Sequence, residues 1–221
     1  TYEEFCLDYQ LDANKKYFLY SGDDITTSPN DPLYLEDTAR AIELLNKKGY
    51  NFGIIFRRCP VDFSTRFDEV INRYKDIITC IEPAWKQIGT AWNAIMPTLD
   101  DMALQANCIH HTLGVLNLGS SMVFDAISHN KTCAYFNYNC PNADLKKWDI
   151  KKIYEYVHFR SMPSKDAVHW VNSPQDVEKV LINMLQLDSI QHQHAKEWFE
   201  IINQTPANQA SLRIVDALKK M

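Results

Sequence analysis

The sequence predicts an α/β protein built on a doubly wound, Rossmann-like parallel sheet with helices on both faces. Short and almost continuously apolar segments alternate with segments whose apolar residues recur at helical spacing. Continuously apolar strands are typical of parallel sheets, which are covered on both faces. A chain of 221 residues can hold one such domain. We place it at residues 17–187, after a leading helix or linker at 1–16 and before C-terminal helices at 188–221.

The strands are predicted where apolar runs end at Gly, Pro or polar residues. They are 17–21, 51–56, 77–81, 92–96, 115–118, 132–137 and 167–171. The helices are predicted from apolar positions three and four residues apart and from stop signals such as Gly49. They are 2–7, 33–48, 62–74, 83–89, 99–110, 121–129, 174–187, 192–203 and 209–220. The alternation of the two sets predicts that functional residues follow the strand ends, where such sheets bind ligands.

Composition narrows the class of protein. Hydrophobic residues make up 46% and charged residues 23% of the chain, and its formal charge is −5. The longest apolar runs are far shorter than the roughly 20 residues that a membrane span needs, and no signal-peptide pattern is visible. An acidic chain with scattered Lys and Arg is a poor ligand for nucleic acid. The six cysteines are scattered without metal-like spacing, so we expect reduced thiols, a cytoplasmic protein and no metal or other cofactor.

The most informative segment is the predicted strand-to-helix turn around Gly119. Gly119 permits a tight turn, Ser120 and Ser121 add hydroxyl donors, and the amide groups through Met122 open a helix. A helix start of this kind can hold a phosphate, but Ser is also an ordinary helix cap. Asp125 lies four residues after Ser121 on the same helix face, where a carboxylate can accept hydrogen bonds from ribose hydroxyls. The residues alone leave both interpretations open.

The run 118–127, followed by 130–134, resembles the donor-binding signature of GT-B glycosyltransferases. That signature is a strand, Gly and Ser residues, an acid before Ala, and a second strand. The resemblance extends loosely over 17–187 and concerns the family's C-terminal, nucleotide-sugar-binding domain. It implies that Gly119, Ser120, Ser121 and Met122 hold the donor's phosphates and that Asp125 holds the ribose. Asp125 stands where Glu is commoner in the family.

Other strand ends carry residues that the resemblance assigns to the donor. Arg57 and Arg58 follow the second strand and are expected to reach the diphosphate, although paired Arg is equally typical of a solvated edge. Gly22 follows the first strand, where the resemblance implies an approach to the phosphates or sugar, although a glycine there is also typical of a simple turn. The resemblance implies that the loop after residue 136 contacts the sugar and that the loop around residue 95 covers the base, although an ordinary polar loop and a core segment are the alternatives. The residues concerned are Asn137 and Asn139 for the sugar, and Ile95 and Met96 within 92–98 for the base.

The sequence therefore predicts the donor-binding domain of a nucleotide-sugar glycosyltransferase. A GT-B enzyme needs two α/β domains facing a cleft, so we expect the acceptor site and catalytic base in an N-terminal domain absent from this chain. The chain alone is then inactive. Lys146-Lys147 and Lys151-Lys152 suggest a peripheral membrane or acidic acceptor contact of the full protein, or a solvated face. The rival interpretations are a nucleotide-sugar 2-epimerase-like domain and a non-catalytic nucleotide-binding or interaction module.

Overall fold

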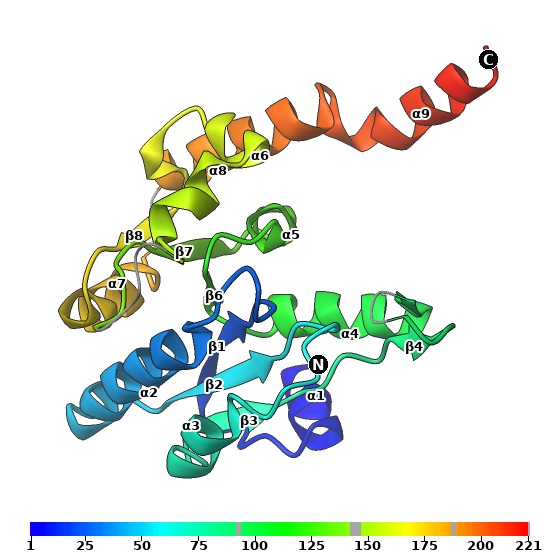
Figure 1. Cartoon of the computed structure of the whole chain (residues 1–221). Helices are drawn as coiled ribbons and strands as arrows, with labels where there is room; N and C mark the ends of the chain where they lie inside the picture. Colours follow the sequence, from blue (N-terminus) through cyan, green and yellow to red (C-terminus); the bar gives the residue numbers. More distant parts are fainter. Residues whose placement is uncertain (92–93, 142–146, 187–188, 221) are drawn as a thin grey trace.

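The core of the protein is a six-stranded parallel sheet, seen in a computed structural model that describes residues 1–91, 94–141, 147–186 and 189–220 (Figure 1). Its strands are β1 (Lys16–Ser21), β2 (Phe52–Arg57), β3 (Ile78–Cys80), β6 (Gly114–Asn117), β7 (Thr132–Phe136) and β8 (His169–Val171). They lie in the order β3-β2-β1-β6-β7-β8, and every neighbouring pair is parallel. The chain winds outward from β1 to β3, returns to the centre, and winds the other way from β6 to β8. The predicted doubly wound sheet is thus confirmed.

The strands explain why helices cover both faces of the sheet. Phe18, Leu19 and Tyr20 are consecutive in β1, and none exposes measurable surface. Because consecutive strand residues point to opposite faces, both faces must be covered. Ile54 and Ile55 in β2 repeat the pattern. The near-continuous apolar runs in the sequence therefore have a direct structural cause.

The helices flank this sheet and connect its strands. Their bounds are α1 Tyr2–Asp8, α2 Asp31–Lys47, α3 Asp68–Arg73, α4 Leu99–His110, α5 Met122–Ser128, α6 Val157–Arg160, α7 Val177–Asn183, α8 Ser189–Asn203 and α9 Ala210–Leu218, with 3-10 turns η1 Ile150–Glu155, η2 Lys165–Ala167, η3 Pro174–Asp176 and η4 Ala207–Gln209. In α2, Leu35, Ala39, Ile42 and Leu45 form the buried stripe that the sequence predicts. The helix ends two residues before Gly49, whose φ is +99°.

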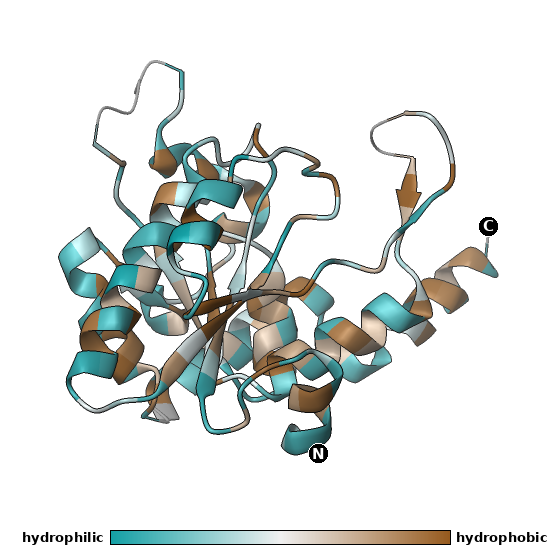
Figure 2. Ribbon diagram, turned by 90° about the horizontal axis from the view of Figure 1, so that it is seen from below, coloured by the Kyte–Doolittle hydropathy of each residue, from teal (hydrophilic) through white to brown (hydrophobic). Residues whose placement is uncertain are grey.

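Two predicted helices differ from the structure. The segment 83–89 is not helical: β4 (Lys86–Gln87) pairs antiparallel with β5 (Ile95–Met96) in a hairpin that projects from the body (Figure 2). The backbone N–H of Ala84 bonds the Asp101 carboxylate at 2.7 Å, which holds the chain extended before β4. The predicted helix 62–74 begins only at Asp68. The Asp62 carboxylate accepts the Ser64 N–H at 3.0 Å, a local bond that competes with helix formation.

The two C-terminal helices differ in how they pack: α8 contacts the body of the protein, whereas α9 buries no residue. Trp198 in α8 is fully buried and packs edge-on against Phe124 of α5, at 4.8 Å between ring centroids. No residue of α9 is buried, and this helix extends away from the sheet (Figure 1). The Arg213 guanidinium fixes α9 to the end of α8 by donating to the Asn203 carbonyl.

Some expectations fall outside the described residues. These are positions 92 and 93 of the predicted base loop, position 146 of the predicted basic segment, and the predicted boundary at 187–188. Among the helices that the structure describes, none combines the length and apolarity needed to cross a bilayer.

Candidate functional site

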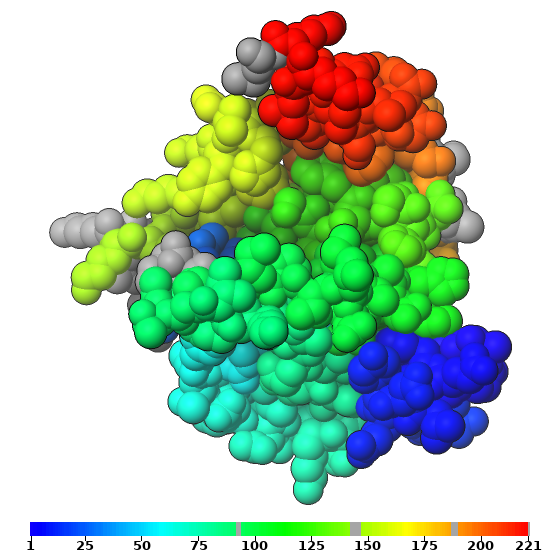
Figure 3. Space-filling model, turned by 90° about the vertical axis from the view of Figure 1, so that its right-hand side faces the viewer, coloured from blue at the N-terminus to red at the C-terminus, as the bar shows by residue number. Residues whose placement is uncertain are grey.

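The strand order of the sheet reverses between β1 and β6, which is where the sequence predicts a ligand. Connections leave β1 and β6 in opposite directions, and sheets of this kind bind ligands beyond the carboxyl ends of the strands at such a point. Figure 3 looks onto this edge, where the surface is hollowed between the segment near residues 150–165 and the green segments below it. Gly22 follows β1 here, and its N–H donates to the Arg57 carbonyl at 2.8 Å. Gly119 begins the turn after β6.

Gly119 is required by its conformation and by its neighbours. Its φ is +65°, which L side chains rarely adopt. A Cβ atom there would lie 2.4 Å from Cγ2 of Ile153 and 3.1 Å from Cε1 of Tyr154, both on η1. The sequence suggested that this glycine lets a ligand approach closely. The structure shows that the close neighbour is η1, which packs onto the turn.

The turn satisfies several of its own amide groups. The Ser120 N–H donates to Oδ1 of Asn117 at 2.9 Å, and the Met122 N–H donates to Oγ of Ser120 at 3.3 Å. Asn117 was not predicted as a site residue, although a polar side chain inside an apolar strand is a visible signal. Ser121 occupies the cap position of α5, is exposed, and makes no side-chain bond to the helix. The exposed hydroxyl of Ser121 can therefore donate to a ligand at this turn.

Asp125 lies one helical turn beyond Ser121 on the exposed side of α5. The Gln105 amide donates to its Oδ2 at 3.3 Å, a long hydrogen bond. Surrounding protein disfavours the charged carboxylate and raises the pKa of Asp125 above its ordinary value. The carboxylate remains accessible to a hydroxyl-bearing ligand that follows the helix from the turn.

The structure gives Arg57 an internal partner. Its guanidinium is buried and pairs with Oδ1 of Asp101 at 2.9 Å. Oδ2 of the same carboxylate accepts the Trp85 indole N–H at 2.7 Å. Asp101 thus joins the end of β2 to the start of the hairpin and to α4. The expected contact between Arg57 and a diphosphate stays a prediction, and any such contact must compete with this ion pair.

Arg58 and Ile95 lie together in a small cavity of about 140 Å³, beside Trp85. The Arg58 guanidinium also approaches the Asp68 carboxylate at 3.5 Å. Met96 is half-exposed on the projecting hairpin. The structure thus brings the predicted base loop to Arg58, on the β3 side of the sheet.

The two predicted sugar-binding amides have different surroundings. Asn137 follows β7, is exposed, and donates from Nδ2 to Oδ1 of Asn172 at 3.0 Å. The Asn139 side chain accepts the Ile150 N–H at 3.0 Å and donates to Oδ1 of Asp149 at 3.2 Å. Asn139 therefore holds the start of η1, whereas Asn137 stands at an open cavity.

Two acids that follow β1 were not predicted as site residues: Asp23 is half-buried in the loop, and Asp31 is the first residue of α2. Asp31 is fully buried, accepts the Tyr20 hydroxyl at 2.6 Å, and accepts the Asp23 N–H at 2.7 Å. Arg66 donates to the carbonyls of Asp23 and Ser28 and so clamps the loop. Burial raises the pKa of Asp23 to about 7 and that of Asp31 to about 6.

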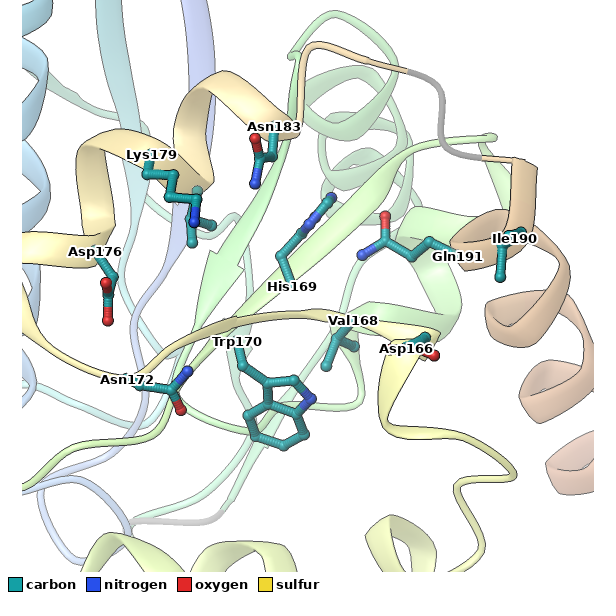
Figure 4. Close-up of a pocket in the computed structure, with 11 residues that line it drawn as sticks. Asp166, Val168, His169, Trp170, Asn172, Asp176, Lys179, Asn183, Ile190 and Gln191 are labelled. Atoms are coloured by element: carbon teal, nitrogen blue, oxygen red, sulfur yellow. The ribbon is translucent and has the colours of Figure 1, made fainter.

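Two adjoining cavities lie along β8, and sequence reasoning missed both. One, of about 470 Å³, is lined by Asp176, Lys179 and Asn183 of the η3–α7 segment (Figure 4). The other, of about 440 Å³, opens at the carboxyl ends of β7 and β8. Trp170 and Asn172 line both cavities. Within the described residues, no group of three or more His, Cys, Asp or Glu side chains is placed to hold a metal ion.

No family model and no curated protein sequence matches the chain. Solved structures do match. S. aureus MnaA in a co-structure with UDP has a TM-score of 0.56 and 15% identity, covering 97% of this chain and 47% of that one. A UDP-GlcNAc 2-epimerase from Neisseria meningitidis bound to UDP-GlcNAc has a TM-score of 0.53 and 12% identity, covering 99% and 48%. WaaG, a glycosyltransferase involved in lipopolysaccharide biosynthesis, has a TM-score of 0.51 and 12% identity, covering 97% and 50%.

These identities support likeness of fold, and the chain spans about half the length of each structure that it matches. The six-stranded parallel sheet and its strand order agree with that likeness. The chain therefore has the Rossmann-like fold found in GT-B glycosyltransferases and UDP-sugar 2-epimerases, over about half of their length.

Proposed function

We propose that this chain is the nucleotide-sugar donor domain of a glycosyltransferase. The observation that carries the proposal is the reversal of strand order between β1 and β6, which marks the crevice where such sheets bind ligands. Two of the similar structures are described as holding UDP or UDP-GlcNAc. The turn at Gly119 directly follows β6, and the exposed Asp125 lies on α5, the helix that starts from this turn.

In this proposal the donor follows α5 from its first residue. The diphosphate accepts a hydrogen bond from the Ser121 hydroxyl and lies at the positive end of the helix dipole. The ribose hydroxyls donate to Asp125 one turn later. Negative charge accumulates on the diphosphate as the glycosidic bond breaks, and donors fixed at that position stabilise it. Asp101 neutralises Arg57, so the proposal does not depend on that guanidinium.

The acceptor and the catalytic base are assigned to a second domain. The chain spans about half the length of the structures that it resembles, and the proposed crevice needs a facing domain to exclude water. We expect this chain to bind donor without transferring its sugar. A cytoplasmic location, independence from a metal or other cofactor, and peripheral membrane association of the full protein belong to the same proposal.

A second candidate is a nucleotide-sugar 2-epimerase-like domain, which the similarity to the N. meningitidis UDP-GlcNAc 2-epimerase favours. Both candidates predict nucleotide binding at the same crevice. They differ in the reaction of the full-length protein, since an epimerase converts UDP-GlcNAc without any acceptor. A non-catalytic interaction module would bind no nucleotide.

Calorimetric titration with UDP, GDP and CDP tests the proposal. We expect Asp125→Ala to weaken the binding of the preferred nucleotide about tenfold, which corresponds to about 1.4 kcal/mol. Ser121→Ala should weaken the binding of this nucleotide several-fold. Ser128→Ala is the matched control, since it removes a hydroxyl at the other end of the same helix. Absence of binding by the wild-type chain, or equal binding by all the variants, would refute the proposed site.

A further inference from the structure

The cavity at the carboxyl ends of β7 and β8, named here the β7–β8 cavity, adjoins the proposed donor crevice. Tyr154 forms part of its wall, and the same ring packs against Gly119 of the turn. Neighbouring strands of a sheet lie about 4.8 Å apart. The cavity is therefore one to two strands beyond β6, on the side away from β1. A group attached to a diphosphate at the Gly119 turn can reach this position.

The amide and aromatic side chains that line the β7–β8 cavity suit a sugar. Its volume of about 440 Å³ lies in the range of small-molecule sites. Asn137 and Asn172 meet at its edge, and their amides can donate to and accept from hydroxyl groups. Trp170 contributes an aromatic face and is held in place by its indole bond to the Lys165 carbonyl at 2.7 Å. Figure 4 shows the Trp170 ring leaving β8 on the side opposite His169.

The charged groups of the cavity add a preference for anions. Lys151 on η1 and Lys165 on η2 both line it, so two cations come from separate elements. Among the described residues, no carboxylate lies within 4 Å of either ammonium group. Glu155 is the acid that lines the same cavity. Asp149 lies close enough to Lys151 for the lysine's positive charge to help lower the pKa of the Asp149 carboxyl.

We infer that the β7–β8 cavity takes the glycosyl group of the donor and that this group is acidic, with a carboxylate or phosphate bound between Lys151 and Lys165. The inference rests on the proposed function, because it assumes that the donor's diphosphate lies at the Gly119 turn. The two arginines nearest the strand ends on the other side of the sheet are engaged in ion pairs. Within the described residues, Lys151 and Lys165 are the cations that line this cavity and can hold an anionic ligand there.

The experiment compares UDP, UDP-glucose and UDP-glucuronate by calorimetry, and glucose, glucose 6-phosphate and glucuronate by NMR of the Trp170 indole signal. We expect UDP-glucuronate to bind at least tenfold more tightly than UDP-glucose. Glucuronate or glucose 6-phosphate should shift the Trp170 signal at concentrations where glucose does not. The free sugars distinguish a carboxylate from a phosphate as the bound anion.

The double variant Lys151→Ala/Lys165→Ala should reduce the tenfold preference to about one while leaving UDP affinity within twofold of wild type. Lys152→Ala is the matched control: it is an exposed lysine on the same 3-10 turn. Three results would overturn the inference. The wild-type chain could bind UDP-glucose and UDP-glucuronate equally, or Lys152→Ala could lose the preference for the acidic donor as fully as the double variant. The double variant could also lose as much affinity for UDP as for UDP-glucuronate. If UDP fails to bind but the acidic sugars still shift Trp170, the proposed function fails and the cavity remains a site for acidic sugars.

Discussion

At the carboxyl edge, the polar side chains of the two halves of the sheet differ in whether they are engaged in ion pairs or exposed around cavities. On the β1–β3 side, Arg57 and Arg66 are fixed by buried or nearly buried partners, Asp101 and Asp62. The cavity described there has a volume of about 140 Å³. On the β6–β8 side, the described cavities measure about 470 and 440 Å³ and carry exposed amide and ammonium groups.

The difference shows that charge at a strand end does not by itself mark a ligand site. Arg57 has the expected residue type and the expected position, yet its guanidinium serves to hold the hairpin and α4. Ser121 is a weaker signal by residue type, but its side chain has no structural task in the helix cap. We therefore expect the β1–β3 side to govern stability and the β6–β8 side to govern binding.

Removal of Asp101 should have the largest effect on stability. Asp101→Ala leaves the buried Arg57 without its partner and frees the Ala84 N–H and the Trp85 indole. Breaking a buried ion pair from one side costs about 3–5 kcal/mol. Urea unfolding measures the loss. Asp100→Ala, on the exposed face of the same helix turn, is the control, and equal stability of the two variants would contradict the structural role of Asp101.

Gly119→Ala should cost about 2–4 kcal/mol, because it combines an unfavourable φ with a displacement of η1. Gly49→Ala separates the two causes. Gly49 also has positive φ, but a Cβ atom there meets nothing within 4 Å. We expect Gly49→Ala to lose only about 1 kcal/mol. If the two variants lose equal free energy in urea unfolding, η1 does not press on the turn.

Asp23 should make stability fall as pH rises. Its pKa is 3.8 in an ordinary environment and about 7 in the folded protein, so the folded state binds more protons between these values. The free energy of unfolding then falls from about pH 4 to pH 7 by at most about 1.4 kcal/mol per unit. Asp31 contributes up to about pH 6. Above pH 6 the slope should disappear in Asp23→Asn and persist in Asp76→Asn, an exposed control; persistence in both would refute the assignment to Asp23.

Much of the sheet could be predicted from the sequence because its strands are buried on both faces. Phe18-Leu19-Tyr20 and Ile54-Ile55 have to be apolar throughout, and such runs are visible without a structure. The segment 83–89 was wrongly predicted as a helix. Its extended form depends on Asp101, which lies 17 residues beyond Ala84 and could not be paired with it from local pattern.

The candidate site could be predicted only in part for the same reason. Gly119 and Asp125 are marked by local spacing, and the structure places them after β6 and on α5, while their contact with a donor stays a prediction. The β7–β8 cavity depends on Lys151, Lys165 and Trp170, which come together only when two 3-10 turns fold over the strand ends. No periodicity links them in the sequence. Arg57 shows the opposite case, since its partner is 44 residues away.

The smallest expected effect on stability comes from Ser121, and it separates the two helix starts at the carboxyl edge. Thr98 caps α4 by accepting the Asp101 N–H at 3.0 Å and by donating to the Ala84 carbonyl at 2.8 Å. Thr98→Ala should therefore cost about 1 kcal/mol, as is usual for a bonded cap.

Ser121→Ala should change the free energy of unfolding by less than about 0.5 kcal/mol, because its hydroxyl makes no bond to α5. The same variant should weaken nucleotide binding, whereas Thr98→Ala should leave it unchanged once folded protein is compared. Urea unfolding and calorimetry on the two variants measure both effects. If Ser121→Ala instead loses about 1 kcal/mol of unfolding free energy and keeps its nucleotide affinity, Ser121 is an ordinary helix cap. Its hydroxyl would then stabilise α5 and take no part in binding a phosphate.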